Sequence, residues 1–191
     1  MRLASLYLRS RRTGLALALL AAVAAATWLW RRVATGEDAL SIMLLITAPS
    51  LTAACVIGAT ASSPVADLEA TASRALPLLR LGHLGGLLAL AALGLTAVGG
   101  ALDGALVRDL AGFTGLALLT ARLAGSAAAW SVPLAYGALA VLVGPTPRWA
   151  WPVQAAANQE AAVIAALLLV LGLGVIVWSG ARDQIGDTDT A

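Results

Sequence analysis

The chain contains six long apolar runs separated by short polar breaks. A helix needs about 20 mostly apolar residues to cross the hydrocarbon core of a bilayer, and each run approaches that length. Of the 191 residues, 60% are hydrophobic and only 12% are charged, which excludes an ordinary soluble domain. We therefore predict an all-α integral membrane protein with one domain, residues 1–191, and about six transmembrane helices. The predicted spans are 13–30, 40–60, 81–98, 105–121, 127–144 and 161–178.

The first 32 residues, MRLASLYLRSRRTGLALALLAAVAAATWLWRR, have the basic head and apolar middle of a secretory signal. However, the run from Thr13 to Trp30 is long enough to span, and Arg31 and Arg32 follow it directly. Trp and Arg at the end of an apolar run are typical of a membrane interface. We predict an uncleaved first span, preceded by a short basic interfacial helix over 1–12.

Arginine asymmetry across the short loops predicts the orientation, because cytoplasmic loops carry an excess of positive charge. All 12 basic residues are Arg, a composition typical of a high-GC genome such as an actinobacterium. If both termini are cytoplasmic, four arginines fall on the far side and eight on the cytoplasmic side. The far-side residues are Arg31, Arg32, Arg108 and Arg148; the cytoplasmic ones are Arg2, Arg9, Arg11, Arg12, Arg74, Arg80, Arg122 and Arg182. We predict an N-in, C-in multi-pass protein of the bacterial cytoplasmic (inner) membrane.

The stretch SSPVADLEATASRALPLLR, residues 62–80, has the pattern of a soluble helix between the second and third spans. Ser63 suits the N-cap, Asp67 and Glu69 suit the positive end of the helix dipole, and Pro77 suits its end. We predict a short amphipathic helix on the cytoplasmic surface. It could simply connect two spans, but anionic lipid would repel its acidic face, so a cytosolic protein is the better partner.

The segment GPTPRWAWPVQAAANQEAAV, residues 144–163, is too polar to cross the bilayer and unusually aromatic for a free loop. Trp is enriched at membrane interfaces, and the amide and carboxylate side chains need water or partners. We predict a re-entrant or interfacial hairpin over 145–160 on the outer face; a simple aromatic belt is the alternative. Its candidate site residues are Trp149, Trp151, Gln154, Asn158 and Glu160.

Catalytic and metal motifs are not apparent. The Walker phosphate loop needs a lysine, which the chain lacks. The segment DGALVRDLAG, residues 103–112, resembles the start of the CDP-alcohol phosphotransferase motif, but no acidic residue follows Asp109 before Glu160. We therefore expect Asp103, Arg108 and Asp109 at the far-side headgroup level. The single histidine, His83, is expected to be structural, and the chain is expected to be neither an enzyme nor a metal or cofactor binder.

Small residues at four-residue spacing allow close helix packing. Gly82 and Gly86 form one such pair, Gly100 and Gly104 another, and the first span is rich in alanine. The pattern predicts tight packing, either within the chain or against a second subunit.

The arrangement of six spans, interfacial N-terminal helix, cytoplasmic helix and outer aromatic hairpin resembles the permease of type-2 ATP-binding-cassette exporters. Two segments, VRDLAGFTGLALLTARLAG (107–125) and WAWPVQ (149–154), are also similar to stretches of uncharacterised actinobacterial membrane proteins. The resemblance implies that the cytoplasmic helix is a coupling helix that docks on a cytosolic ATPase, and that permeases pair with a second copy or a related subunit. ATP and Mg²⁺ would then bind to the ATPase. The implied docking residues are Asp67, Glu69, Thr71 and Arg74.

We therefore predict a permease subunit embedded in the lipid bilayer, with no nucleic-acid partner. Its exported cargo is expected to be amphipathic or apolar, because the predicted spans offer almost no buried charge. One alternative is the substrate-binding membrane subunit of an energy-coupling-factor importer, in which Gln154, Asn158 and Glu160 would lie near the outer mouth. Another is a non-transport membrane scaffold or accessory protein. Proton-coupled transport is disfavoured because no predicted span carries a central Asp or Glu.

Overall fold

The computed structural model describes residues 13–33, 39–61 and 76–179, and these residues form helices and short connections without a strand. The long helices are α2 (Thr13–Val33), α3 (Ala39–Ala59), α5 (Leu76–Gly99), α6 (Asp103–Ala124), α7 (Ser131–Val143) and α8 (Gln159–Ser179). Three short 3-10 helices, η1 (Gly100–Leu102), η2 (Ser126–Ala128) and η3 (Trp151–Val153), lie between them. The predicted interfacial helix 1–12 lies outside the described residues. So do residues 62–75 of the predicted coupling helix, with Asp67, Glu69, Thr71 and Arg74, whereas residues 76–80 belong to α5.

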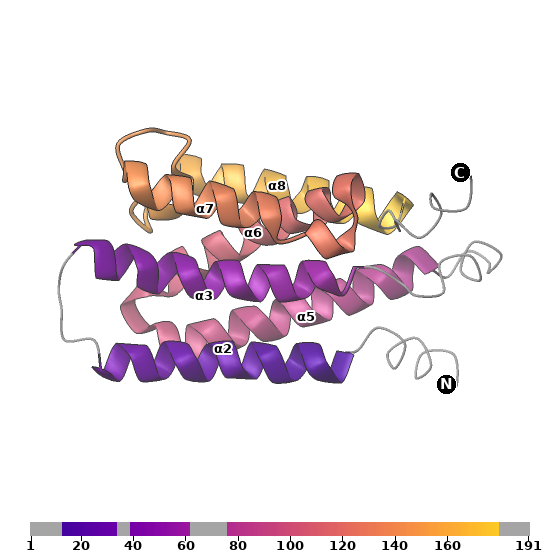
Figure 1. Ribbon diagram of the computed structural model, residues 1–191, viewed down its shortest axis with the longest axis horizontal. Coiled ribbons are helices and arrows are strands. Elements are labelled where there is room, and N and C mark those ends of the chain that lie inside the picture. The colour runs from indigo at the N-terminus through magenta and orange to yellow at the C-terminus, as the bar shows by residue number, and fades with distance from the viewer. Residues whose placement is uncertain (1–12, 34–38, 62–75, 180–191) are drawn as a thin grey trace, which may run out of the picture.

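Six helical segments of the described chain are long and apolar enough to cross a membrane. The prediction of an all-helical multi-pass membrane protein is therefore confirmed. The helices run side by side along the long axis of the molecule and alternate in direction (Figure 1). The end of α2, the start of α3 and the links from α5 to α6 and from α7 to α8 lie at one end (Figure 1). The end of α3 and the start of α5 lie at the opposite end (Figure 1).

Two helix starts, those of α5 and α7, differ most from the predicted spans, and both lie near a proline. The third span begins at Leu76 rather than Leu81, so Pro77 lies in the first turn of α5. The fifth span is divided into η2 and a 13-residue α7, which places Pro133 in the first turn of α7. Proline is tolerated in a first turn because its missing N–H would have no intrahelical partner there.

Helix α6 is the centre of the bundle. It has the lowest mean hydropathy of the six spans, yet 72% of its span is buried, compared with 17–33% for the other five. It packs most extensively against α8 and α3, and it also contacts α5 and α7. Its buried polar residues are Arg108, Asp109, Thr114 and Thr120. Polar groups on a spanning helix are costly in lipid, so the bundle surrounds this helix with protein.

Glycines allow the neighbouring helices to approach α6 closely. A β-carbon at Gly115 would lie 2.3 Å from the backbone of Leu168 on α8, and one at Gly172 would lie 2.5 Å from the carbonyl oxygen of Gly115. On the α3 side, a β-carbon at Gly58 would lie 2.8 Å from that of Ala117. Backbones can approach this closely only where side chains are absent or very small.

The glycine pairs singled out from the sequence do not make such crossings within the described chain. A β-carbon at Gly82 or Gly86 would meet no atom within 4 Å, and one at Gly104 would only touch Ala156 at 3.9 Å. Gly100 has a φ of +58°, and a β-carbon built on it would lie 3.0 Å from Nη2 of Arg31. Tight packing within the chain therefore occurs elsewhere than predicted, at Gly58, Gly115 and Gly172.

Candidate functional site

Residues 144–158, which we call the cap, close one end of the bundle between α7 and α8. The cap begins where α7 ends, at Gly144, whose φ is +80° and whose N–H donates to the carbonyl of Ala140 at 2.9 Å. This left-handed glycine is a common way to end a helix. The cap ends at Asn158, whose Oδ1 accepts a hydrogen bond from the N–H of Ala161 at 3.2 Å and so caps α8.

Trp151 anchors the cap in the core. Its side chain is 2% exposed, with ring centroids 5.2 Å from Phe113 on α6 and 5.9 Å from Tyr136 on α7. The prediction that Trp151 is an interface residue is therefore wrong, because its indole fills the space beside Gly112. Trp149 is 43% exposed and meets Tyr136 edge-on, and its carbonyl accepts a hydrogen bond from the Tyr136 hydroxyl.

Arg108 of α6 holds the cap against the central helix through hydrogen bonds. Its guanidinium donates to three cap carbonyls: Ala155 at 2.9 Å, Gln154 at 3.1 Å and Pro152 at 3.2 Å. The residue is only 6% exposed, so the expectation that it lies among lipid headgroups is wrong. The cap covers it, and the carbonyls around η3 replace the water that a headgroup position would supply.

Asp109 balances the charge of Arg108. Its Oδ1 accepts a hydrogen bond from Arg108 Nε at 2.9 Å, and its side chain is fully buried. The expectation that Asp109 lies among lipid headgroups is therefore also wrong. The Arg108–Asp109 pair shows that one span carries buried charge. The other oxygen, Oδ2, is buried and has no hydrogen-bond partner among the residues that the structure describes. Asp103, the third residue expected at the headgroups, begins α6, and its side chain lies outside the described part.

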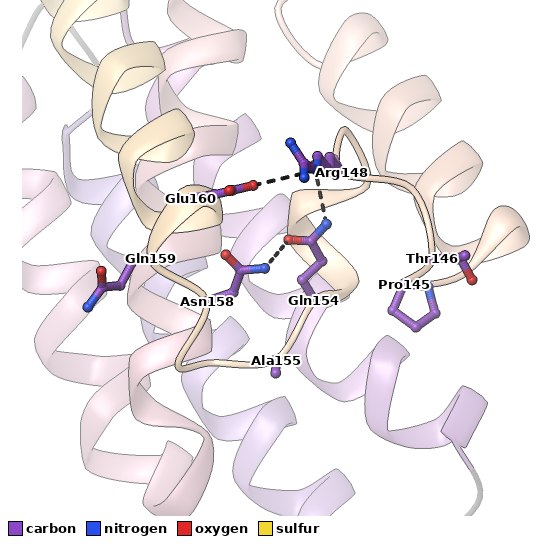
Figure 2. Close-up of a pocket in the computed structure, with 8 residues that line it drawn as sticks. All are labelled: Pro145, Thr146, Arg148, Gln154, Ala155, Asn158, Gln159 and Glu160. Carbon is purple, nitrogen blue, oxygen red and sulfur yellow. Dashed lines mark hydrogen bonds and ion pairs between the residues drawn. The ribbon is translucent and has the colours of Figure 1, made fainter.

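An open polar pocket of about 450 Å³ lies over the cap (Figure 2). Gln154 and Ala155 line this pocket, and the carbonyls of the same two residues accept hydrogen bonds from Arg108. The pocket and the buried pair therefore share contact with the same short stretch of cap backbone. The pocket is lined by Pro145, Thr146, Arg148, Gln154, Ala155, Asn158, Gln159 and Glu160.

Two of the amide side chains that line the pocket, Gln154 and Asn158, hold the cap together. Gln154 Nε2 donates to the carbonyls of Pro147 at 2.9 Å and Arg148 at 3.2 Å, and Asn158 Nδ2 donates to Gln154 Oε1 at 2.7 Å (Figure 2). The charged groups at the pocket are Arg148 and Glu160, which are well exposed and 4.0 Å apart. Of the five predicted hairpin residues, Gln154, Asn158 and Glu160 are brought together at the pocket. Trp149 and Trp151 instead pack against Tyr136.

Metal ligands do not gather at this site: the described residues contain no group of three or more His, Cys, Asp or Glu side chains that could hold a metal ion. His83 is buried on α5. Two other arginines that were predicted for the far side also contact protein: Arg31 donates to the carbonyl of Val98, and the Arg32 guanidinium lies 4.5 Å from the ring centre of Trp28. They therefore act in part as structural groups.

No family model, no curated protein and no solved structure matches this chain. The site must be interpreted from its own geometry. It consists of a cap anchored by one buried tryptophan, an ion pair on the central helix beneath that cap, and a polar pocket above it.

Proposed function

We propose that the protein is the membrane-spanning permease subunit of an ATP-binding-cassette transporter, with the cap as the gate at one end of the bundle. The observation that carries this proposal is the Arg108–Asp109 pair, buried on the most enclosed helix of the described chain. An ion pair inside a membrane-spanning helix is expensive, and such groups usually mark a solute or ion pathway.

The cargo is proposed to carry hydrogen-bonding groups. The expectation of an amphipathic or apolar cargo rested on predicted spans with almost no buried charge, and the buried Arg108 and Asp109 favour a cargo that can hydrogen-bond. A solute that entered from the pocket would meet the backbone at Gln154 and Ala155 before it reached the pair. Movement of this backbone is the proposed gating step.

Energy is proposed to come from a separate cytosolic ATPase, which would bind ATP and Mg²⁺. The segment between α3 and α5 would be its dock, through Asp67, Glu69, Thr71 and Arg74. Its two flanking helix ends lie at the opposite end of the bundle from the cap (Figure 1). In the proposed N-in, C-in orientation in the cytoplasmic membrane, the dock would therefore be inside and the cap outside. A second permease copy or a related subunit would complete the transporter.

A second candidate is the substrate-binding membrane subunit of an energy-coupling-factor importer. The pocket favours it, because Arg148, Gln154, Asn158 and Glu160 gather around one opening at the end of a single six-helix bundle. Such a subunit would capture a solute from outside without a second permease copy. The two candidates share the cap as the solute entrance and differ in their partners.

Charge reversal tests the dock. We expect Asp67→Arg/Glu69→Arg to abolish retention of the ATPase during gentle detergent purification, while the protein still reaches the membrane at normal levels. The matched control is Glu37→Arg/Asp38→Arg, which reverses two acidic residues between α2 and α3 in the sequence. Equal ATPase retention by both variants would contradict the proposed dock. Absence of any ATPase from the unmodified protein would favour a non-transport scaffold instead.

A further inference from the structure

The Asp109 carboxylate is bonded on one side only. Oδ1 accepts a hydrogen bond from Arg108 Nε, whereas Oδ2 is buried without a hydrogen-bond partner among the described residues. A buried polar oxygen is almost always satisfied by protein, water or a ligand. Three kinds of partner would satisfy this one: a proton of its own, a bound cation, or a neutral hydrogen-bond donor.

The charge of Arg108 decides between these three partners. A guanidinium is not deprotonated in proteins, so the buried Arg108 is positively charged and needs the negative charge of Asp109. A proton on Asp109 would leave a net positive charge under the cap, and so would a cation on Oδ2. A neutral donor leaves the pair balanced.

We propose that Asp109 Oδ2 is a binding site for a neutral O–H or N–H donor. The donor is either a resident water or a hydroxyl or amide group of a small polar solute. A water at such a site is common when polar groups are buried without protein partners. This inference deepens the proposed function and rests on it for the solute alone, because only a transporter brings a solute to this depth.

The cap explains how such a donor could be exchanged. Arg108 holds the carbonyls of Gln154 and Ala155, and those two residues line the pocket. Release of these bonds would free the pocket-lining backbone at Gln154 and Ala155 from Arg108, the neighbour and ion-pair partner of Asp109. Movement of this backbone is the step by which we propose that the donor exchanges.

The test is a crystal structure of the full chain, purified from its host membranes and grown in lipid, at a resolution that places ordered waters. An isolated peak within hydrogen-bond distance of Oδ2 would identify water. Density that continues toward the pocket would identify a solute, to be named by mass spectrometry of the extract. No density at Oδ2 would overturn the inference.

Infrared spectroscopy of the protein in nanodiscs at neutral pH checks the charge. The difference between the wild type and Asp109→Asn should show the loss of an ionised carboxylate band, which shifts in D₂O because its donor exchanges. Loss of a protonated carboxyl band instead would overturn the inference. If Asp109→Asn does not fold, Asp109→Glu provides the same assignment through a shifted band. Neither measurement involves the ATPase, so failure here is distinguishable from failure of the proposed dock.

Discussion

Trp151 occupies the space that a side chain at position 112 would need. A β-carbon built on Gly112 would lie 2.3 Å from Cη2 of the indole. The cap and the central helix are therefore fitted to each other at this point, with a large side chain from one and none from the other. This contact, together with the three carbonyl bonds of Arg108, fixes the cap on α6.

We expect Gly112→Ala to destabilise the protein by about 1–3 kcal/mol, a typical cost of overpacking a filled core. The added methyl group would displace Trp151 and loosen the cap. Gly86→Ala is the matched control, because a β-carbon there meets no atom within 4 Å. Reversible unfolding in mixed micelles measures both. Equal stability of the two variants would show that Trp151 does not fit against Gly112.

The two cap tryptophans should respond differently to truncation. Trp151→Ala should cost about 3–5 kcal/mol, as expected for an aromatic core residue, because Trp151 packs between Phe113 and Tyr136. Trp149→Ala should cost much less, since its side chain is 43% exposed and the hydrogen bond from Tyr136 goes to its backbone. Thermal unfolding monitored by near-UV circular dichroism would rank them. A larger loss for Trp149 would mean that the cap is anchored at its outer edge.

The buried ion pair should show strong coupling. Arg108→Met and Asp109→Asn should each cost about 3–5 kcal/mol, because each leaves an uncompensated buried group. The double variant should cost clearly less than the sum of the two. Arg148→Gln with Glu160→Gln is the control cycle, where an exposed pair 4.0 Å apart should contribute about 0–1 kcal/mol. Simple additivity at 108 and 109 would mean that the pair does not act as a unit.

Two glycines on one helix should behave differently. Gly172→Ala should destabilise by about 1–3 kcal/mol or separate α8 from α6, because the new β-carbon would lie 2.5 Å from the carbonyl oxygen of Gly115. Gly174→Ala, two residues further along α8, has no atom within 4 Å and should be neutral. Unfolding of both variants in the same detergent is the measurement. A neutral Gly172→Ala would contradict the close crossing of α6 and α8.

The six helices could be predicted from the sequence, because the length of an apolar run is a direct consequence of bilayer thickness. Their arrangement could not. Lipid is as apolar as a protein core, so an exposed leucine on α8 and a buried one on α6 look alike in sequence. Glycine spacing was equally ambiguous: Gly82 and Gly86 have the expected interval but open surroundings, whereas Gly115 crosses α8 closely.

The site was only partly predictable, for a related reason. The hairpin residues Gln154 and Asn158 were singled out because amides need partners, and they bond to each other. Arg108 and Asp109 were expected at the headgroups because they lie near a predicted span end. Only the folded cap shows that they are enclosed, since its carbonyls come from a segment more than 40 residues away, with a sequence separation of 44 for Pro152. The available signal was two adjacent opposite charges inside an otherwise apolar run.

Purification of the unmodified protein from its native membranes tests the central claim most directly. The complex would be extracted in a gentle detergent and its components quantified by mass spectrometry. The transporter account predicts a cytosolic ATP-binding-cassette ATPase in stoichiometric amount. Absence of any ATPase, under conditions that preserve a known ATP-binding-cassette complex from the same membranes, would contradict it.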